Sequence, residues 1–238
     1  MALLMDLQAI ETALVRLIAL SAAPEADVFE DKEPLSADVV RRMIGGYAYI
    51  NELLRAQVNL FSYGSSAHWL ELNHLVLCGA TPERREQFRN HIAQTERRFY
   101  DDSIGGIGER IDWLMRHRSN SPEALAAGIF LHMTSAPQLF IEGNRRTATL
   151  VASYALTSRG RPPLVVTEND YKAYFALTDD CKHMHRDRWD HFLSYYGFSY
   201  RMERFIRQTA DARYLKESDG PEGPATGMAS SPCRANPS

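Results

Sequence analysis

The spacing of apolar residues limits what this chain can fold into more than any other feature. Over most of its length they recur every three or four positions, which is the period of an amphipathic helix with one buried face. The N-terminus follows this pattern with Leu3, Leu7, Ile10, Leu14, Leu17 and Ile18. Only residues 162–166 form a convincing β-branched run, which is typical of one edge of a small hairpin. The sequence therefore predicts an all-α fold with a small amount of sheet.

Start signals divide this pattern into separate helices. Ser36 and Ser65 or Ser66 can each cap a helix, and Thr81 and Ser121 are each followed by proline and glutamate, a strong helix start. The predicted helices cover residues 36–58, 66–78, 82–97, 111–115, 122–133, 145–158, 171–178 and 188–205, the last interrupted at Gly197.

Composition divides the chain into three parts. Residues 1–34 are predicted to form an N-terminal helix and a connector, and residues 35–216 one helical domain. Residues 217–238 are rich in Gly, Pro, Ser and Ala, with almost no large apolar residue, so a disordered tail is predicted. The apolar stripe of the N-terminal helix packs either on the core or on a second copy of the chain, which would be a homo-oligomer.

Charge and cysteine content narrow the function classes. The 238 residues carry 27 Lys and Arg against 30 Asp and Glu, a net charge of −3, so no overall basic field attracts nucleic acid. Asp6, Glu11 and Arg16 interrupt the apolar N-terminus, unlike a signal peptide, and no stretch of about 18 uncharged apolar residues suggests a membrane span. Three scattered cysteines suit a reducing compartment. We expect a cytoplasmic protein with no nucleic-acid or membrane partner.

The segment QLFIEGNRRTAT, which begins at residue 138, carries the pattern of a binding site. Gly143 permits a tight turn into a helix whose first amides are unpaired at its positive end, and such an end attracts anions. Arg145 and Arg146 in that first turn oppose the helix dipole, an arrangement that a bound phosphate would stabilise. Beside a phosphate, Glu142 can hold Mg²⁺. The alternative is that Asn144 only caps the helix and the arginines bind a neighbouring acid.

This segment resembles the signature loop of Fic and Doc proteins, H-x-F-x-(D/E)-(G/A)-N-(G/K)-R. The matching positions are Phe140, Glu142, Gly143, Asn144 and Arg146, and a weaker similarity extends over residues 47–174. The resemblance implies the all-α Fic fold, a bundle of helices. It also implies transfer of AMP, or another phosphate-containing group, from ATP or another nucleotide with Mg²⁺ to a hydroxyl of a target protein.

The resemblance further implies roles for single residues. Glu142 would bind Mg²⁺, while Asn144 and the amides around Gly143 would hold the phosphates. Arg146 would neutralise the leaving phosphates, and Phe140 would anchor the loop in the core.

A second part of the site is implied at residues 98–108. Adjacent aromatics, two acids and three glycines favour a turn or a short hairpin there. The family's target-clamping flap falls at the same place, so the resemblance assigns Phe99, Tyr100 and Asp101 to a β-hairpin flap that contacts the target.

Gln138 stands where the family has the histidine that takes the proton from the attacking hydroxyl. A primary amide has no basic site near neutral pH, and general-base help is worth about 10²–10⁴-fold in rate. His132, Asp101 and Asp102 are candidate replacement bases, although a packed histidine and an ordinary surface turn also explain them. Thr149 stands where many members have a second arginine.

Three interpretations follow from this departure. The first is a degenerate phosphate- or nucleotide-binding module, impaired in AMP transfer, with a binding or regulatory role. The second is an active nucleotidyl- or phosphoryl-type transferase with a base other than histidine, and the third is a helical interaction protein whose loop is only structural. Gln138 disfavours the second, and the extra cation Arg145 disfavours the third, so the first is preferred.

Overall fold

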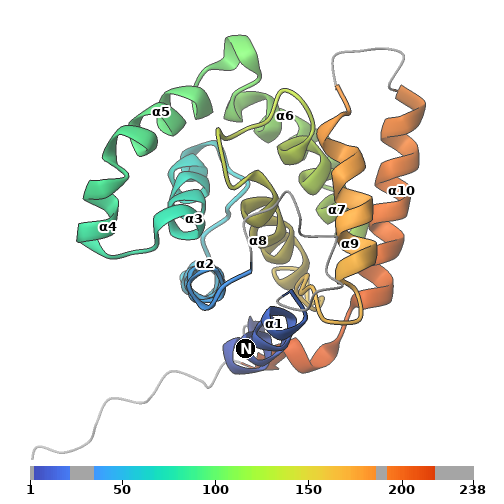
Figure 1. Cartoon of the computed structure of the whole chain (residues 1–238). Helices are drawn as coiled ribbons and strands as arrows, with labels where there is room; N and C mark the ends of the chain where they lie inside the picture. The colour runs from blue at the N-terminus through green and yellow to red at the C-terminus, as the bar shows by residue number, and fades with distance from the viewer. Residues whose placement is uncertain (1–2, 22–34, 186–191, 218–238) are drawn as a thin grey trace, which may run out of the picture.

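The computed structural model describes residues 3–21, 35–185 and 192–217. Within these residues the chain forms ten α-helices and two short strands (Figure 1). In chain order they are β1 (Leu3–Met5), α1 (Leu7–Ser21), α2 (Ala37–Arg55), α3 (Ser66–Cys78), α4 (Pro82–Gln87), α5 (Arg89–Phe99), α6 (Ile107–His117), α7 (Pro122–Thr134), α8 (Asn144–Thr157), α9 (Tyr171–Lys182), α10 (Phe192–Thr209) and β2 (Leu215–Glu217). The prediction of an all-α fold with a small amount of sheet is confirmed.

Helix α8 is the central element of the fold. It packs along α7 and also contacts α2 and α3, while α10 packs on both α7 and α9 (Figure 1). Every residue from Thr147 to Thr157 is buried, which explains why this stretch has no charged side chain on any face. The first turn, with Arg145 and Arg146, is less buried, so it is the part of α8 that a ligand can reach.

Two of the predicted helix starts are confirmed by their cap hydrogen bonds. Ser36 Oγ accepts a bond from the Val39 N–H at 3.3 Å, and Ser121 Oγ accepts one from the Ala124 N–H at 3.2 Å. Gly79 closes α3 with a φ of 79°, a left-handed conformation that glycine adopts without strain.

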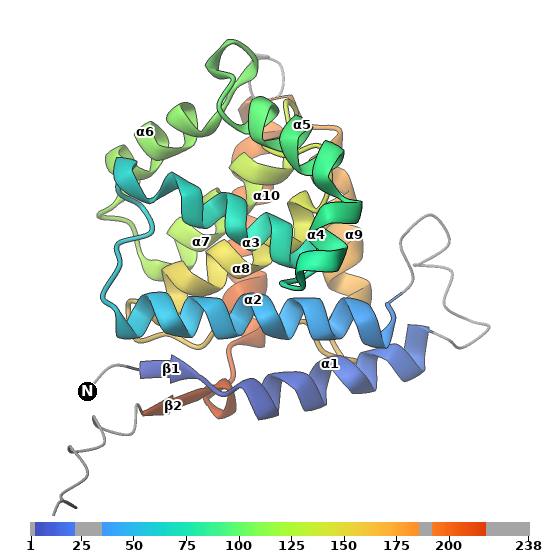
Figure 2. The same cartoon turned by 90° about the vertical axis from the view of Figure 1, so that its left-hand side faces the viewer.

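The sheet joins the two ends of the described chain. β1 pairs antiparallel with β2 in the register Leu3↔Glu217 and Met5↔Leu215, and Figure 2 shows the pair beside α1 and below α2. Asn51 of α2 fixes β1 to the core, because its side chain bonds both the N–H and the carbonyl of Met5 at 2.8 and 2.9 Å. Glu217, the first residue of the predicted tail, therefore belongs to β2, and the rest of that prediction lies outside the described residues.

Residues 162–166 are not a strand, which corrects the expectation of a hairpin edge there. They form an extended segment in which Leu164 is buried. The Tyr47 hydroxyl donates to the Leu164 carbonyl at 2.8 Å, and the Leu164 N–H donates to Ser153 Oγ at 3.1 Å. Side chains of α2 and α8 thus satisfy the backbone groups that a partner strand would otherwise satisfy.

The expected hairpin at residues 98–108 is also wrong. α5 continues to Phe99, a short 3₁₀ turn follows at Asp102–Ile104, and α6 begins at Ile107. Phe99 stays in the helix because its ring is fully buried against Phe140, and Gly105 then reverses the chain with a φ of 75°. A turn is present at this place, but the flap has no strands.

Several helices differ from the prediction: α6 covers Ile107–His117 rather than residues 111–115, and α9 extends to Lys182 rather than to residue 178. The helix expected over residues 82–97 is divided at Phe88 into α4 and α5, because Phe88 has a φ of −93° and a ψ of 6°. α10 continues through Gly197 without interruption. An isolated glycine costs a helix only about 1 kcal/mol, which packing on α7 can offset.

Helix α1 covers the side of the molecule below α2 in Figure 2. Its buried face contains Ile10, Leu14 and Leu17, so the predicted apolar stripe packs on the core of the same chain. Over the part of the chain that the structure describes, no helix combines the length and the apolar character needed to cross a membrane.

Candidate functional site

The loop between α7 and α8 brings most of the predicted site residues together. Phe140 fixes its inner side: the ring is buried and stacks on Phe99 with an interplanar angle of 9°. Asn73 of α3 fixes its outer side, because Asn73 Nδ2 donates to the Glu142 carbonyl and to Thr147 Oγ1, each at 3.0 Å. Phe140 therefore lies in the core as predicted, and the loop is held from both sides.

Gly143 makes the turn into α8. Its φ of 73° is left-handed, and a Cβ atom at this position would lie only 3.0 Å from Asn73 Nδ2. The conformation therefore favours glycine here, and an added Cβ atom would also be tightly packed. The Gly143 carbonyl accepts the Thr147 N–H at 2.9 Å, whereas the N–H groups of the first turn precede any helix carbonyl that could accept them.

The side chain of Asn144 forms hydrogen bonds within the loop. Its Oδ1 accepts the Phe140 N–H at 2.8 Å, and its Nδ2 donates to the Phe140 carbonyl at 2.7 Å and to Gln138 Oε1 at 3.1 Å. Both amide hydrogens are thus engaged. A phosphate at this helix end would be held by backbone N–H groups, with the Asn144 side chain shaping the loop beneath them.

Gln138 bridges the helices on either side of the loop. Its Nε2 donates to the Thr134 carbonyl at the end of α7 at 3.0 Å, and its Oε1 accepts from Asn144. The Gln138 carbonyl accepts a hydrogen bond from Arg98 of α5. The position therefore supports the loop but supplies no basic atom.

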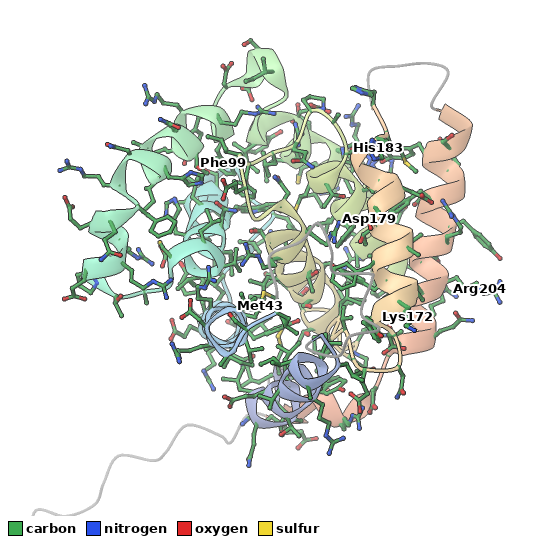
Figure 3. All side chains as sticks on the ribbon, in the orientation of Figure 1. Met43, Phe99, Lys172, Asp179, His183 and Arg204 are labelled. Atoms are coloured by element: carbon green, nitrogen blue, oxygen red, sulfur yellow. The ribbon has the colours of Figure 1, made fainter. Side chains whose placement is uncertain are left out.

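A cavity of about 440 Å³ opens at the first turn of α8, within the size range of small-molecule sites. Its polar side is the loop, with Gln138, Glu142, Gly143, Asn144, Arg145 and Arg146. Its other sides are mostly apolar and come from α1, α2 and α9. Figure 3 labels Met43 on α2, which lines the cavity. It also labels Asp179 on α9, which pairs with Arg145 of α8.

Arg145 turns toward α9. Its Nη2 lies 2.7 Å from Asp179 Oδ1, and its guanidinium carbon lies 5.2 Å from the centroid of the Phe175 ring. For this arginine, the alternative of a neighbouring acid is therefore correct. Its charge is balanced within the protein.

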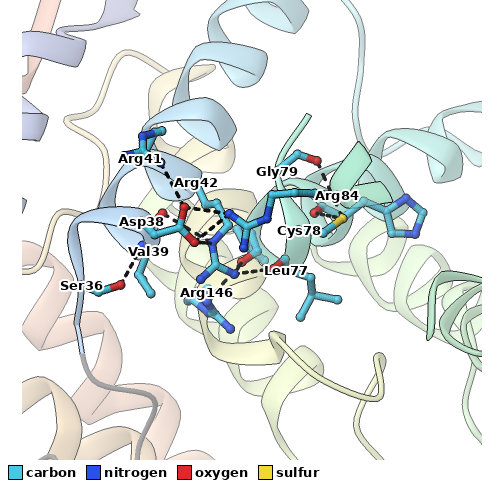
Figure 4. A network of polar contacts seen from close by, with 12 residues as sticks. Ser36, Asp38, Val39, Arg41, Arg42, Leu77, Cys78, Gly79, Arg84 and Arg146 are labelled. Atoms are coloured by element: carbon cyan, nitrogen blue, oxygen red, sulfur yellow. Dashed lines mark hydrogen bonds and ion pairs between the residues drawn. The ribbon is translucent and has the colours of Figure 1, made fainter. Parts of the chain in front are cut away.

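Arg146 turns the opposite way, to the end of α3. Its Nη1 donates to the Val76 carbonyl at 3.1 Å, and Arg42 of α2 donates to the same carbonyl at 3.0 Å and also to the Leu77 carbonyl (Figure 4). Cations suit the negative end of a helix. Two guanidinium groups that share one carbonyl also repel each other, and a carboxylate beside them offsets that repulsion.

Asp38 supplies a carboxylate to this arginine group. It pairs with Arg84 at 2.8 Å, Arg41 at 3.1 Å and Arg42 at 3.3 Å (Figure 4). The hydrogen bond from Arg84 holds the pKa of Asp38 below its ordinary value of 3.8, so the carboxylate is ionised near neutral pH. One acid is thus shared among three arginines, and Arg146 brings a fourth cation to the same helix end.

Glu142, the predicted Mg²⁺ ligand, is exposed at the rim of the cavity. Among residues 3–21, 35–185 and 192–217, no three His, Cys, Asp or Glu side chains gather closely enough to hold a metal ion. Mg²⁺ commonly takes one or two carboxylates together with substrate phosphates and water. Glu142 offers one such carboxylate at the cavity.

The residues assigned to the target flap do not act together. Phe99 is fully buried under the loop and cannot contact a target protein, which corrects its assignment. Tyr100 is 47% exposed, and Asp101 Oδ1 accepts the Ser103 N–H at 3.1 Å in a surface turn. Only Tyr100 and Asp101 are placed where a partner could reach them.

The candidate replacement bases do not line the cavity that the structure describes. His132 is buried among aromatic rings, with its centroid 4.4 Å from Trp113 and 5.7 Å from Tyr195, so the packing explanation fits it. Thr149, at the place of the family's second arginine, donates to the Arg145 carbonyl and lies 2.9 Å from the Tyr174 hydroxyl.

Sequence reasoning missed two residues that shape the site, Asn73 and Asp179. Asn73 had a usable signal, since it is a lone amide on an otherwise apolar helix face and such groups need a specific partner. Asp179 had no such signal, because it lies 34 residues after Arg145 and no local sequence pattern links the two residues.

Comparisons with known proteins assign no family to this chain. No family model matches the chain, and no relative is found among the curated proteins. The likeness to Fic and Doc proteins therefore stays a prediction from the loop sequence, and the geometry of the site carries the functional interpretation.

Proposed function

We propose that this chain binds a nucleotide or another phosphate-bearing ligand in the cavity at the first turn of α8, and that it acts mainly as a binding or regulatory module. The observation that carries the proposal is that one cavity is lined by Gly143, by the start of α8 and by Arg146. Backbone N–H groups at a helix start favour an anion, and a guanidinium group forms strong charge-assisted bonds with phosphate.

The two arginines have unequal roles in this proposal. Arg146 pairs with the phosphate oxygens, because it lines the cavity beside Gly143 and the start of α8. Arg145 contributes less, because Asp179 already balances its charge. Glu142 shares a Mg²⁺ ion with the phosphates, as the resemblance implies and its exposure at the cavity permits.

Transfer chemistry is expected to be weak in the wild-type chain. The amide of Gln138 cannot take a proton, and it is already bonded at both ends. Transfer of phosphate groups depends mainly on positioning and charge neutralisation, so a slow AMPylation-like reaction on a target hydroxyl is the second candidate. The exposed carboxylate of Glu142 at the cavity rim supports that candidate.

Thermal unfolding with ATP and Mg²⁺ tests the binding proposal. Ligand at about 100 times its Kd stabilises the folded state by about 2.7 kcal/mol, which should raise Tm by about 5–10 °C. Arg146→Ala should remove most of this shift. Arg207→Ala should keep it, because that arginine is exposed on α10 and pairs with Glu203. The absence of any shift with ATP, ADP, pyrophosphate or an alkyl diphosphate up to about 1 mM would overturn the proposal.

Gln138→His tests why transfer is weak. An imidazole N–H can replace the bond to the Thr134 carbonyl, and the ring titrates near neutral pH. Transfer of α-labelled AMP from ATP to protein hydroxyls should rise by about 10²–10⁴-fold. The double variant with Glu142→Ala should lose this gain. Equal transfer by the wild type and the histidine variant would show that the base is supplied elsewhere.

A further inference from the structure

The far side of the cavity is an apolar wall made by three helices. α1 contributes Leu14 and Leu17, α2 contributes Val39 and Met43, and α9 contributes Phe175. None of these side chains can form a conventional hydrogen bond. The part of a ligand that extends away from the first turn of α8 therefore meets hydrocarbon and an aromatic ring.

The hydroxyl groups among the lining residues of this wall are buried and already bonded inside the protein. Their partners are the Leu164 carbonyl for Tyr47 (2.8 Å), Thr149 Oγ1 for Tyr174 (2.9 Å), the Phe130 carbonyl for Thr134 (2.7 Å) and the Phe175 carbonyl for Thr178 (3.4 Å). Burial also raises the pKa of Tyr174 to about 12, so this hydroxyl keeps its proton. Among the lining residues that the structure describes, each of these four hydroxyl groups therefore already has a hydrogen-bond partner within the protein.

A nucleobase would be a poor match for such a wall. Its edge carries several donors and acceptors, and each one buried without a partner loses its hydrogen bonds to water. Sites that recognise polar ligand groups place complementary groups opposite them. An alkyl or aryl body loses nothing of this kind and gains from leaving water.

We infer that the cavity takes a phosphate or diphosphate ester with an apolar body, with the phosphate at the first turn of α8 and the body against α1, α2 and α9. This inference rests on the proposed function, because it uses the same phosphate position. Arg145 marks the border between the two halves, since its guanidinium group lies over the Phe175 ring while Arg146 stays on the phosphate side. The flexible thioether of Met43 lets the wall adapt to the body's shape.

Titration calorimetry with a ligand series tests this inference on the full chain. The ligands are inorganic pyrophosphate, ADP, GDP, CDP and geranyl diphosphate, each with Mg²⁺. Geranyl diphosphate should bind at least tenfold more tightly than pyrophosphate and than ADP, and the three nucleotides should differ from one another by less than threefold. If pyrophosphate and geranyl diphosphate bind equally, or if ADP binds tenfold more tightly than GDP and geranyl diphosphate, the apolar-ester inference is wrong while the proposed phosphate site stands. If none of the ligands binds, both are wrong.

A matched pair of variants on α1 links the selectivity to the wall. Leu17 lines the cavity, whereas Val15, two residues earlier, is 50% exposed on the outer face of the helix. Leu17→Ser should weaken geranyl diphosphate at least fivefold more than it weakens pyrophosphate, and Val15→Ser should weaken neither. Equal losses for both ligands in Leu17→Ser would contradict the inference. If Leu17→Ser does not fold, the wild-type ligand series still decides.

Discussion

Arg145 and Arg146 are neighbours in the first turn of α8, but their side chains have different surroundings. On the α9 side, Arg145 meets Asp179 at 2.7 Å and lies over an aromatic ring, so its charge is balanced locally. On the α3 side, Arg146 shares the Val76 carbonyl with Arg42, whose carboxylate partner Asp38 also serves other arginines.

At one helix start, one cation thus holds two helices together while the next lies at the cavity where we propose that a ligand binds. A cation in the first helical turn is unfavourable unless something negative is near it. For Arg145 the negative group is the Asp179 side chain, and this ion pair links α8 to α9. Arg146 instead bonds the Val76 carbonyl and lines the cavity, where we expect a ligand phosphate to bind it.

The largest effect on stability should come from Arg42, which holds the α3 side together. Its buried guanidinium group bonds the Val76 and Leu77 carbonyls and pairs with Asp38. Arg42→Ala removes the bond to the Leu77 carbonyl and one partner each of the Val76 carbonyl and Asp38, and should lower the free energy of unfolding by about 2–4 kcal/mol. Arg41→Ala is the matched control, since Arg41 is mostly exposed and should cost less than about 0.5 kcal/mol. Urea unfolding measures both, and equal losses would contradict the account.

The next effect should come from the turn that directs both arginines. Gly143→Ala forces a left-handed φ on a residue with a Cβ atom and brings that atom to 3.0 Å from Asn73 Nδ2. We expect a loss of about 1–3 kcal/mol and weaker phosphate binding. Gly45→Ala on α2 is the control, because nothing lies within 4 Å of its added Cβ and alanine favours the helix. An unchanged stability in Gly143→Ala would mean that the loop adapts easily.

The Arg145–Asp179 pair should have a smaller effect. Asp179 is 43% exposed, so solvent screens the pair. A double-mutant cycle with Arg145→Ala and Asp179→Asn should give a coupling free energy of about 0.5–1 kcal/mol. A coupling near zero would remove the distinction between the two sides, since Arg145 would then be as available to a ligand as Arg146.

The smallest effect should be a pH dependence from Asp38. The Arg84 hydrogen bond lowers the pKa of the folded state, so this carboxylate stabilises the fold above its ordinary pKa of 3.8 and loses that contribution as the pH falls through the lowered value. The difference in unfolding free energy between the wild type and Asp38→Asn should therefore shrink between about pH 5 and about pH 3. A difference that is constant with pH would show that the ionised carboxylate does not stabilise this arginine group.

Local chemistry explains how far the sequence could predict this molecule. Cap residues such as Ser36 and Ser121, and the glycine turn at residue 143, act over a few residues and could be recognised directly. The pairing of β1 with β2 and the burial of residues 162–166 depend on segments far apart in the chain, so they could not. The same holds for the site: its loop was predicted, but the directions of the arginines are set by partners 34 and 70 residues away.

The most direct test is a crystal structure of the wild-type protein with pyrophosphate and Mg²⁺. We expect a diphosphate about 3 Å from the backbone nitrogens of the first turn of α8 and from the guanidinium group of Arg146, with the Arg145–Asp179 pair intact. Glu142 should face the metal ion. A diphosphate bound elsewhere, or one held by Arg145 after its separation from Asp179, would contradict the central claim.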